Sequence, residues 1–236
     1  SEVASWLHDG EVDIALVPVA ALLNDPIQGP ANTELRVIPD LAIGCDGAVH
    51  SVLVVAETPL EEWTHLYLDG VSRTSVRLAE LLFTRGPLAA RVRSDIRIED
   101  VPAHTGLDRA TGTRATLVIG DRALDIADRF THTVDLGRAW KDWTGLPFVF
   151  AVWAGRSDLD PRIVEQIRGA GLNGLKDLRA GRLESELSPS DHTYLTQHIR
   201  YDLDDSATMG LMRFGSLGYR TGLLSSEHFS QKRLKN

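Results

Sequence analysis

Residues 68–75, which read LDGVSRTS, have the residue types of an anion-binding turn. Gly70 permits a tight turn after a strand-like apolar run. The hydroxyl residues that open the helical pattern after it are Ser72, Thr74 and Ser75. The first N–H groups of a helix are unpaired and partially positive, so such a turn favours a carboxylate or phosphate. The same hydroxyls are common helix N-caps, and taken alone the pattern favours capping.

Two further turns could bring polar side chains to the same site. Residues 44–47 read GCDG and precede an apolar run, which makes Asp46 and Ser51 candidate ligand contacts. Gly120 and Asp121 follow a strand-like run, and ligands in open α/β sheets bind at the carboxyl ends of parallel strands. The alternatives are an ordinary turn for Asp46 and a helix cap for Asp121.

Several classes of chemistry are disfavoured by what the sequence lacks. It has no P-loop and no G-x-S-x-G motif. A single cysteine, Cys45, excludes an internal disulfide and a multi-cysteine metal site, and we expect it to be a small buried residue. The histidines are scattered without metal-ligand spacing, although His50 beside Ser51 has a suggestive position. We therefore predict neither a metal nor a cofactor.

Composition is that of a folded globular protein. Apolar residues make up 43% of the 236 positions and charged residues 25%, with a net charge of −8. A nucleic-acid surface would need a basic stripe, and the basic cluster at Gln231–Lys235 is the single one in the sequence. No apolar run approaches the ~20 residues that span a bilayer, and no secretory signal is visible. We predict no nucleic-acid partner and no membrane insertion.

Strand-like and helix-like segments alternate along the chain, which predicts an α/β protein. Two apolar strand-like segments, Val49–Ala56 and Leu146–Ala154, bracket a self-contained α/β segment. If both cross between two lobes they form a hinge, and a ligand would bind between the lobes. The C-terminal third is expected to be mainly helical, with one helix at Ser190–Tyr201. The expected first lobe is discontinuous, at 1–56 and 147–236, and the inserted second lobe is 57–146.

A long motif from Asp135 to Trp153 reads DLGRAWKDWTGLPFVFAVW. It resembles the pattern D-L-G-x-x-W-x-x-x-T-G-L-P-F-V-F-A-x-W of the menaquinone-biosynthesis family that includes the chorismate dehydratase of the futalosine pathway. The resemblance implies a two-lobed, periplasmic-binding-protein-like (type II) α/β fold with two hinge strands. It also implies a cytoplasmic lyase, without cofactor, that eliminates water from chorismate to give 3-[(1-carboxyvinyl)oxy]benzoate. The oligomeric state is expected to be either a monomer or a homodimer. Shorter matches in the family's order lie at 7–13, 39–53, 72–75, 119–124 and 194–214.

The resemblance also implies substrate-binding positions. Ser51 matches a serine that contacts substrate, and the turn that begins at Gly70 matches an anion-binding turn. Gly120 and Asp121 match an I-G-D element that would contact ligand or close the lobes. The predicted substrate-binding residues are Asp46, Ser51, Gly70, Ser72, Thr74, Ser75, Gly120 and Asp121.

Two departures from the family concern the mechanism. Members normally begin with a strand and a Tyr-x-Asn-x-x-Pro motif, whose asparagine is a candidate for proton removal, and no such segment precedes Ser1. We therefore expect the chain to lack an N-terminal strand of the first lobe, and we assign no catalytic residue. In addition, Pro18 is followed by Val19, Ala20 and Ala21, where many relatives carry serines.

Two rival functions remain open at this point. The same fold hosts many non-catalytic proteins, so a solute-binding protein for an aromatic or dicarboxylate acid is the main alternative. The related dihydroxynaphthoate synthase of the same pathway is a second, although the tryptophan-rich motif and the SRTS turn resemble the dehydratase more closely.

Overall fold

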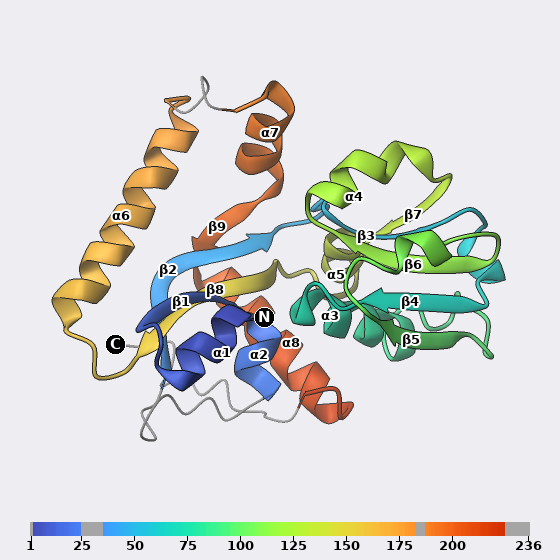
Figure 1. Ribbon diagram of the computed structural model, residues 1–236, viewed down its shortest axis with the longest axis horizontal. Helices are drawn as coiled ribbons and strands as arrows, with labels where there is room; N and C mark the ends of the chain where they lie inside the picture. Colours follow the sequence, from blue (N-terminus) through green and yellow to red (C-terminus); the bar gives the residue numbers. More distant parts are fainter. Residues whose placement is uncertain (1, 25–34, 183–186, 225–236) are drawn as a thin grey trace.

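A computed structural model of the protein describes residues 2–24, 35–182 and 187–224, and its strands form two separate sheets (Figure 1). The basic cluster Gln231–Lys235 lies outside these residues. The first sheet has the order β1-β8-β2-β9, and neighbouring strands are antiparallel. Its strands are β1 at Ile14–Pro18, β8 at Phe148–Arg156, β2 at Leu35–Cys45 and β9 at Arg200–Leu203.

The second sheet is mixed, with the order β5-β4-β6-β3-β7. Strand β4 pairs in parallel with β5 and β6, whereas β3 pairs in antiparallel fashion with β6 and β7. We refer to the two sheets with their helices as the first and second lobes. The strands of the second sheet are β5 at Arg97–Val101, β4 at His65–Asp69, β6 at Arg114–Ile119, β3 at Val52–Ala56 and β7 at His132–Asp135.

Helices pack around both sheets (Figure 1). Helix α6 lies along the outer side of the first lobe, and α7 and α4 lie at the same end of the molecule on either side of the division. Every helix in the described ranges is too short or too polar to span a bilayer. The first-lobe helices are α1 Glu2–Asp9, α2 Val19–Asn24, α6 Pro161–Arg179, α7 Pro189–Thr193, the π-helical turn η5 Tyr194–His198 and α8 Asp205–Arg220. Those of the second lobe are α3 Arg73–Thr84, α4 Asp121–Ile126 and α5 Leu136–Thr144, with short 3₁₀ turns at Leu60–Glu62, Leu107–Arg109 and Ala127–Arg129.

Strand β3 is apolar at every position because both of its faces are covered. Val52 and Val54 belong to the main core, whereas Leu53 and Val55 pack with Ile126 of α4 in a second cluster. A strand buried on both faces reads as a continuous apolar run rather than as an alternation. The unbroken run therefore correctly predicted a strand at this position.

The boundary between the lobes differs from the one expected at residue 56. Strand β3, at Val52–Ala56, lies between β6 and β7 in the second sheet, and β8 lies wholly in the first sheet, so neither strand crosses as a hinge. The chain crosses in two loops, which we call the first connector (residues 46–51) and the second connector (residues 145–147). A strand that is apolar on both faces carries no pattern to reveal which sheet it joins. We propose lobes at 2–45 with 148–224, and at 52–144.

One carboxylate holds the first connector in place. The side chain of Asp135 accepts the backbone N–H of Val49 at 3.0 Å and that of His50 at 2.7 Å. It also caps α5 by accepting an N–H of the first turn at 2.9 Å. The connector has left-handed residues at Gly47, with φ 123°, and at His50, with φ 62°. Such a conformation is costly for a non-glycine residue, and the hydrogen bonds to Asp135 offset that cost at His50.

The second connector is fixed by the helix that precedes it. Gly145 ends α5 in the left-handed conformation, with φ 72°, which is a common helix C-cap. The buried indole of Trp140 donates from Nε1 to the carbonyl of Pro147 at 3.1 Å. The same ring packs edge-on against Phe148 and Phe214. Trp140 therefore links α5 of the second lobe to β8 and α8 of the first.

The main hydrophobic core is continuous across the division between the lobes. Helix α3 of the second lobe contacts α2, α8 and β8 of the first. A single cluster of buried side chains accordingly includes Leu23, Phe83 and Phe214. On this side of the molecule the lobes are joined by apolar contacts, which are the largest favourable contribution to folding.

The helix expected at Ser190–Tyr201 forms only in part. It begins as α7, continues as the π-helical turn η5, and then gives way to strand β9. Strand β9 pairs with β2, with Gly44 opposite Arg200 and Leu41 opposite Asp202. Pairing with a distant strand outweighs local helix propensity here, and that pairing is not visible in a local sequence window.

Asp135→Ala should lower the free energy of unfolding by about 3 kcal/mol, because it removes a helix cap and the charged acceptor of two connector amides. Urea denaturation followed by circular dichroism measures the loss. Asp160→Ala is the matched control, because Asp160 caps α6 through Arg162 at 2.9 Å on an exposed surface. A smaller loss is expected there, and equal losses would contradict the role of Asp135 in holding the connector.

Candidate functional site

Strand register brings most of the predicted site residues to one edge of the second-lobe sheet. Strands β4 and β6 are parallel, so Gly70 and Gly120, which follow them, leave the sheet at the same edge. Strand β3 starts there too, since it runs antiparallel to β6 and pairs Val52 with Ile119. Ser51 immediately precedes it. This edge is the one that the first connector enters from the first lobe (Figure 1).

At the start of α3, hydroxyl groups cap the helix and contact the first lobe. Ser72 Oγ accepts the backbone N–H of Ser75 at 3.4 Å and the Ser75 hydroxyl at 3.1 Å. Thr74 Oγ1 accepts the N–H of Ala20, in α2, at 3.1 Å. A hydroxyl that accepts a hydrogen bond keeps its own proton, so Ser72 and Thr74 each retain a proton to donate, and Thr74 is fully buried in this arrangement of the lobes. Ser75 donates its proton to Ser72 and thereby supports the turn.

A second polar group surrounds Ser51, whose side chain is buried. The Ser51 carbonyl accepts the N–H of Gly120 at 2.8 Å, which extends the pairing of β3 with β6. Gly120 has φ 71°, where glycine is favoured, and the exposed Asp121 then opens α4. The Ser51 hydroxyl accepts the phenol of Tyr194 at 2.6 Å. Tyr194 lies in η5, so this hydrogen bond joins the two lobes.

The environment of Tyr194 keeps its phenol protonated. Burial raises the pKa of Tyr194 above its usual value, the hydrogen bond to Ser51 opposes the rise, and the charge of Asp121 adds to it. The neutral phenol is therefore the stable form at neutral pH, and it acts as a hydrogen-bond donor.

A cavity of about 470 Å³ lies beside this group and is lined by both lobes. Leu124 comes from α4, Tyr194 and His198 come from η5, and His50 comes from the first connector. The rings of His50 and His198 have centroids 4.2 Å apart. Burial lowers the pKa of His198 and the neighbouring His50 lowers it further, so His198 is neutral at neutral pH. The volume of the cavity suits a small organic ligand, but none of the eight predicted substrate-binding residues is in its lining.

Asp46 has a different environment from the other predicted residues. Its carboxylate forms ion pairs with Lys141 of α5, at 2.5 Å, and with Arg200 of β9, at 3.4 Å. It lines a separate cavity of about 230 Å³ beside Arg179 and Tyr201. A carboxylate repels an anionic ligand, and this one already bridges two cations from different lobes. The structure therefore favours an interlobe tie for Asp46 over substrate binding.

The buried cysteine is unsuited to nucleophilic chemistry. Burial raises the pKa of Cys45 to about 12, and the nearby charge of Asp135 contributes. Cys45 also contacts the backbone of α5, because a Cβ added at Gly137 would lie 2.6 Å from its sulfur. Within the described residues, no group of three His, Cys, Asp or Glu side chains is arranged to hold a metal ion.

Two residues of this region were not among the sequence predictions. Tyr194 lies in a polar segment that reads as an ordinary helix, and its one signal was the family match at 194–214. Asp135 was noticed as part of a motif, but its contacts with Val49 and His50 are 86 and 85 residues away in sequence. No local spacing could have indicated them.

Solved structures with the same arrangement support a two-lobed binding-protein fold. The periplasmic aliphatic sulphonate binding protein SsuA from Escherichia coli aligns with a TM-score of 0.59 and 13% identity, over 100% of this chain and 79% of that one. A protein from Archaeoglobus fulgidus aligns with a TM-score of 0.62 and 18% identity, over 94% and 84%. At such identities the likeness concerns the fold alone. The fold and the interlobe site thus define a two-lobed, periplasmic-binding-protein-like α/β protein, which confirms the predicted class.

Sequence comparison is more specific. A family profile described as "Menaquinone biosynthesis" matches residues 1–220. The chorismate dehydratase of Thermus thermophilus is 30% identical, over 91% of this chain and 82% of that protein. The chain belongs to the menaquinone biosynthesis family, and the resemblance carried by DLGRAWKDWTGLPFVFAVW is confirmed.

Tyr194 should ionise above the usual pKa of about 10, because burial and Asp121 disfavour the phenolate. In the unfolded chain the Tyr194 phenol loses its proton at the usual pKa, before the folded protein does. The contribution of the neutral phenol to the free energy of unfolding is therefore complete below about pH 10 and is lost as pH rises through the raised pKa of the folded state. The difference between alkaline absorbance titrations of wild type and Tyr194→Phe isolates this tyrosine. A component that titrates at or below about pH 10 would contradict the prediction.

Proposed function

We propose that the protein is a chorismate dehydratase, a lyase that eliminates water from chorismate to give 3-[(1-carboxyvinyl)oxy]benzoate. Membership of the menaquinone biosynthesis family and the related dehydratase support this reaction. The structural observation that carries the proposal is a pair of donor groups at one edge of the second-lobe sheet. One consists of the Ser72 and Thr74 hydroxyls, and the other of the Ser51 hydroxyl. Chorismate has two carboxylates to be held.

The reaction itself requires little covalent participation by the protein. A base removes the proton from the ring carbon that bears the enolpyruvyl ether, and the electron pair moves into the ring, where the ring carboxylate stabilises it. The C–O bond of the neighbouring hydroxyl then breaks, the leaving hydroxide takes up a proton, which balances the one removed by the base, and the ring becomes aromatic as water leaves. Such an elimination gains most from fixed orientation and from hydrogen-bond donors placed where negative charge develops.

The two donor groups are suited to these tasks. Ser72 and Thr74 hold one carboxylate, because each hydroxyl accepts from the protein and retains a proton to donate. The positive end of α3 adds to their attraction for an anion. Ser51 holds the second carboxylate. Asp121 would repel either carboxylate, so we assign it to contacts that close the lobes.

The rival functions make different demands on the same site. A solute-binding protein for an aromatic or dicarboxylate acid would use the same donors without turnover, and the likeness to SsuA concerns the fold that both readings share. The related dihydroxynaphthoate synthase would not convert chorismate. A cytoplasmic location follows from the proposed role in menaquinone biosynthesis and stays a prediction, as does the choice between monomer and homodimer.

Incubation of the protein with chorismate should consume it and yield one equivalent of the aromatic product, followed by absorbance and mass spectrometry. A loss of 18 mass units, that of one water molecule, is about the expected change for this elimination. Tight binding of chorismate without turnover would favour the solute-binding alternative. The absence of both binding and turnover would favour the related synthase.

Ser72→Ala and Thr74→Val should each weaken chorismate binding about tenfold, since a hydrogen bond to a charged group contributes about 1.5 kcal/mol or more. Isothermal titration calorimetry measures the affinity, and Thr74→Ser, which keeps the hydroxyl, should restore most of it. Thr84→Val is the control, because Thr84 lies exposed at the far end of α3 and bonds the carbonyl of Glu80 at 2.7 Å. Unchanged affinity in both site variants would overturn the assigned binding turn.

A further inference from the structure

The hydrogen bond from Tyr194 to Ser51 connects residues that belong to different lobes. Ser51 moves with the second lobe, because its carbonyl accepts the N–H of Gly120 at 2.8 Å and continues the pairing of β3 with β6. Tyr194 belongs to η5, which leads into β9 of the first-lobe sheet. Their 2.6 Å hydrogen bond therefore forms only when the two lobes lie close together at the site.

The bond also determines what the Ser51 hydroxyl can do. A serine hydroxyl has one proton and two acceptor positions, and Tyr194 uses an acceptor position. The Ser51 proton is left to donate, and none of the residues that the structure describes accepts it. Only 4% of Ser51 is exposed, so the acceptor of this proton must be a group that packs directly against the side chain. A buried donor without an acceptor is costly, and an anionic ligand would relieve that cost.

We propose that Tyr194 is a positioning residue, which orients the Ser51 hydroxyl as a donor to one carboxylate of the substrate. The inference rests on the proposed function and identifies a further residue that this function requires. The π-helical turn η5 presents the phenol to Ser51, and irregular turns of this kind are frequent at functional sites. The cavity of about 470 Å³ adjoins this hydrogen bond and is lined by Leu124 of the second lobe and Tyr194 of the first, so there is space for a ligand beside the bond.

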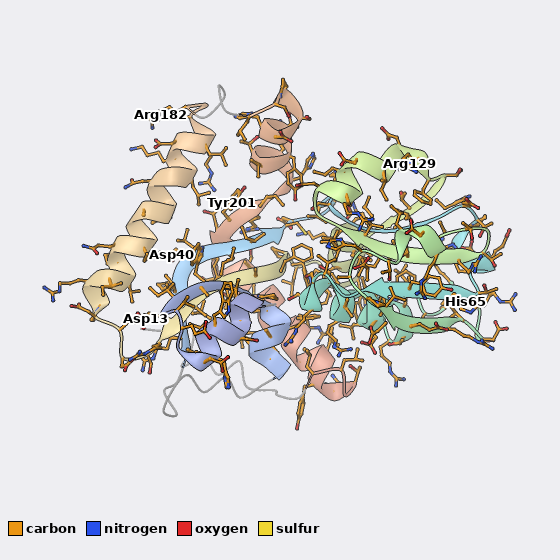
Figure 2. All side chains as sticks on the ribbon, in the orientation of Figure 1. Asp13, Asp40, His65, Arg129, Arg182 and Tyr201 are labelled. Carbon is orange, nitrogen blue, oxygen red and sulfur yellow. The ribbon has the colours of Figure 1, made fainter. Side chains whose placement is uncertain are left out.

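The hydrogen bond of Tyr194 favours a role beyond packing. A phenylalanine would fill the same space, yet the tyrosine oxygen makes a short bond to a buried hydroxyl. Tyr201 provides the comparison, since it is also half-buried and lies seven positions later, on β9 (Figure 2). If Tyr194 acts through Ser51, removal of its oxygen has an effect that depends on whether the serine hydroxyl is present.

The test is a double-mutant cycle on chorismate turnover with Tyr194→Phe, Ser51→Ala and the double variant. Tyr194→Phe should raise KM about tenfold with little change in kcat, the pattern for lost ground-state binding. The double variant should resemble Ser51→Ala alone, because the phenol has no serine hydroxyl left to orient. Tyr201→Phe, the matched control, should keep the wild-type KM. Circular dichroism and thermal unfolding establish that each variant is folded.

The outcomes separate this inference from the proposed function. Wild-type turnover with an unchanged KM in Tyr194→Phe would overturn the inference alone. So would additive effects of Tyr194→Phe and Ser51→Ala, which would indicate that the tyrosine acts on the fold and not through the serine. Absence of wild-type turnover would overturn the proposed function itself. If Tyr194→Phe does not fold, the Ser51→Ala variant tests the inference. An unchanged KM in Ser51→Ala would overturn it, because the Ser51 hydroxyl would then not contribute to substrate binding.

Discussion

The arrangement of the site depends on the carboxylate of Asp135. It accepts the amides of Val49 and His50 in the first connector while it caps α5, the helix that leads into the second connector. One side chain therefore fixes the first connector directly and also starts the helix that ends at the second connector. Without it, the left-handed conformation of His50 would lack the bonds that compensate its cost. Because Ser51 follows His50 directly, the direction in which the serine enters β3 is set by the same carboxylate.

Close packing around Asp135 explains the neighbouring residue types. Gly137 allows α5 to approach the first connector, since an added Cβ would lie 2.6 Å from both Cys45 Sγ and the carbonyl of Gly47. Cys45 is a small buried side chain beside a carboxylate, which accounts for the rise of its pKa to about 12. A residue that could be mistaken for a nucleophile is thus part of the packing that holds the connector. The motif that identifies the family acts here through architecture and not through chemistry.

Sequence predicts the local features of this protein better than its long-range ones. The hydroxyl-rich turn at the start of α3 and the strand at β3 were both expected, since each has a local signature in spacing or apolar content. The sequence did not predict that β3 joins the second sheet, because a strand buried on both faces fits either sheet. Asp46 stays a predicted ligand contact, and its ion pairs with Lys141 and Arg200 could not be read from local sequence. Tyr194 went unnoticed, since its partner Ser51 is 143 residues away.

The two sides of the interlobe contact differ in kind, and this difference bears on how the lobes could respond to a ligand. Around α3, α5 and α8 they share apolar packing, with Trp140 against Phe148 and Phe214. Two buried hydrogen bonds accompany that packing, from the Ala20 amide to Thr74 and from the Trp140 indole to the Pro147 carbonyl. At the opposite end, α4 and η5 face each other across a cavity and meet through the polar bond between Tyr194 and Ser51. A hydroxyl can gain an anionic acceptor without losing its existing donor, so a ligand can strengthen this contact while the apolar side stays fixed.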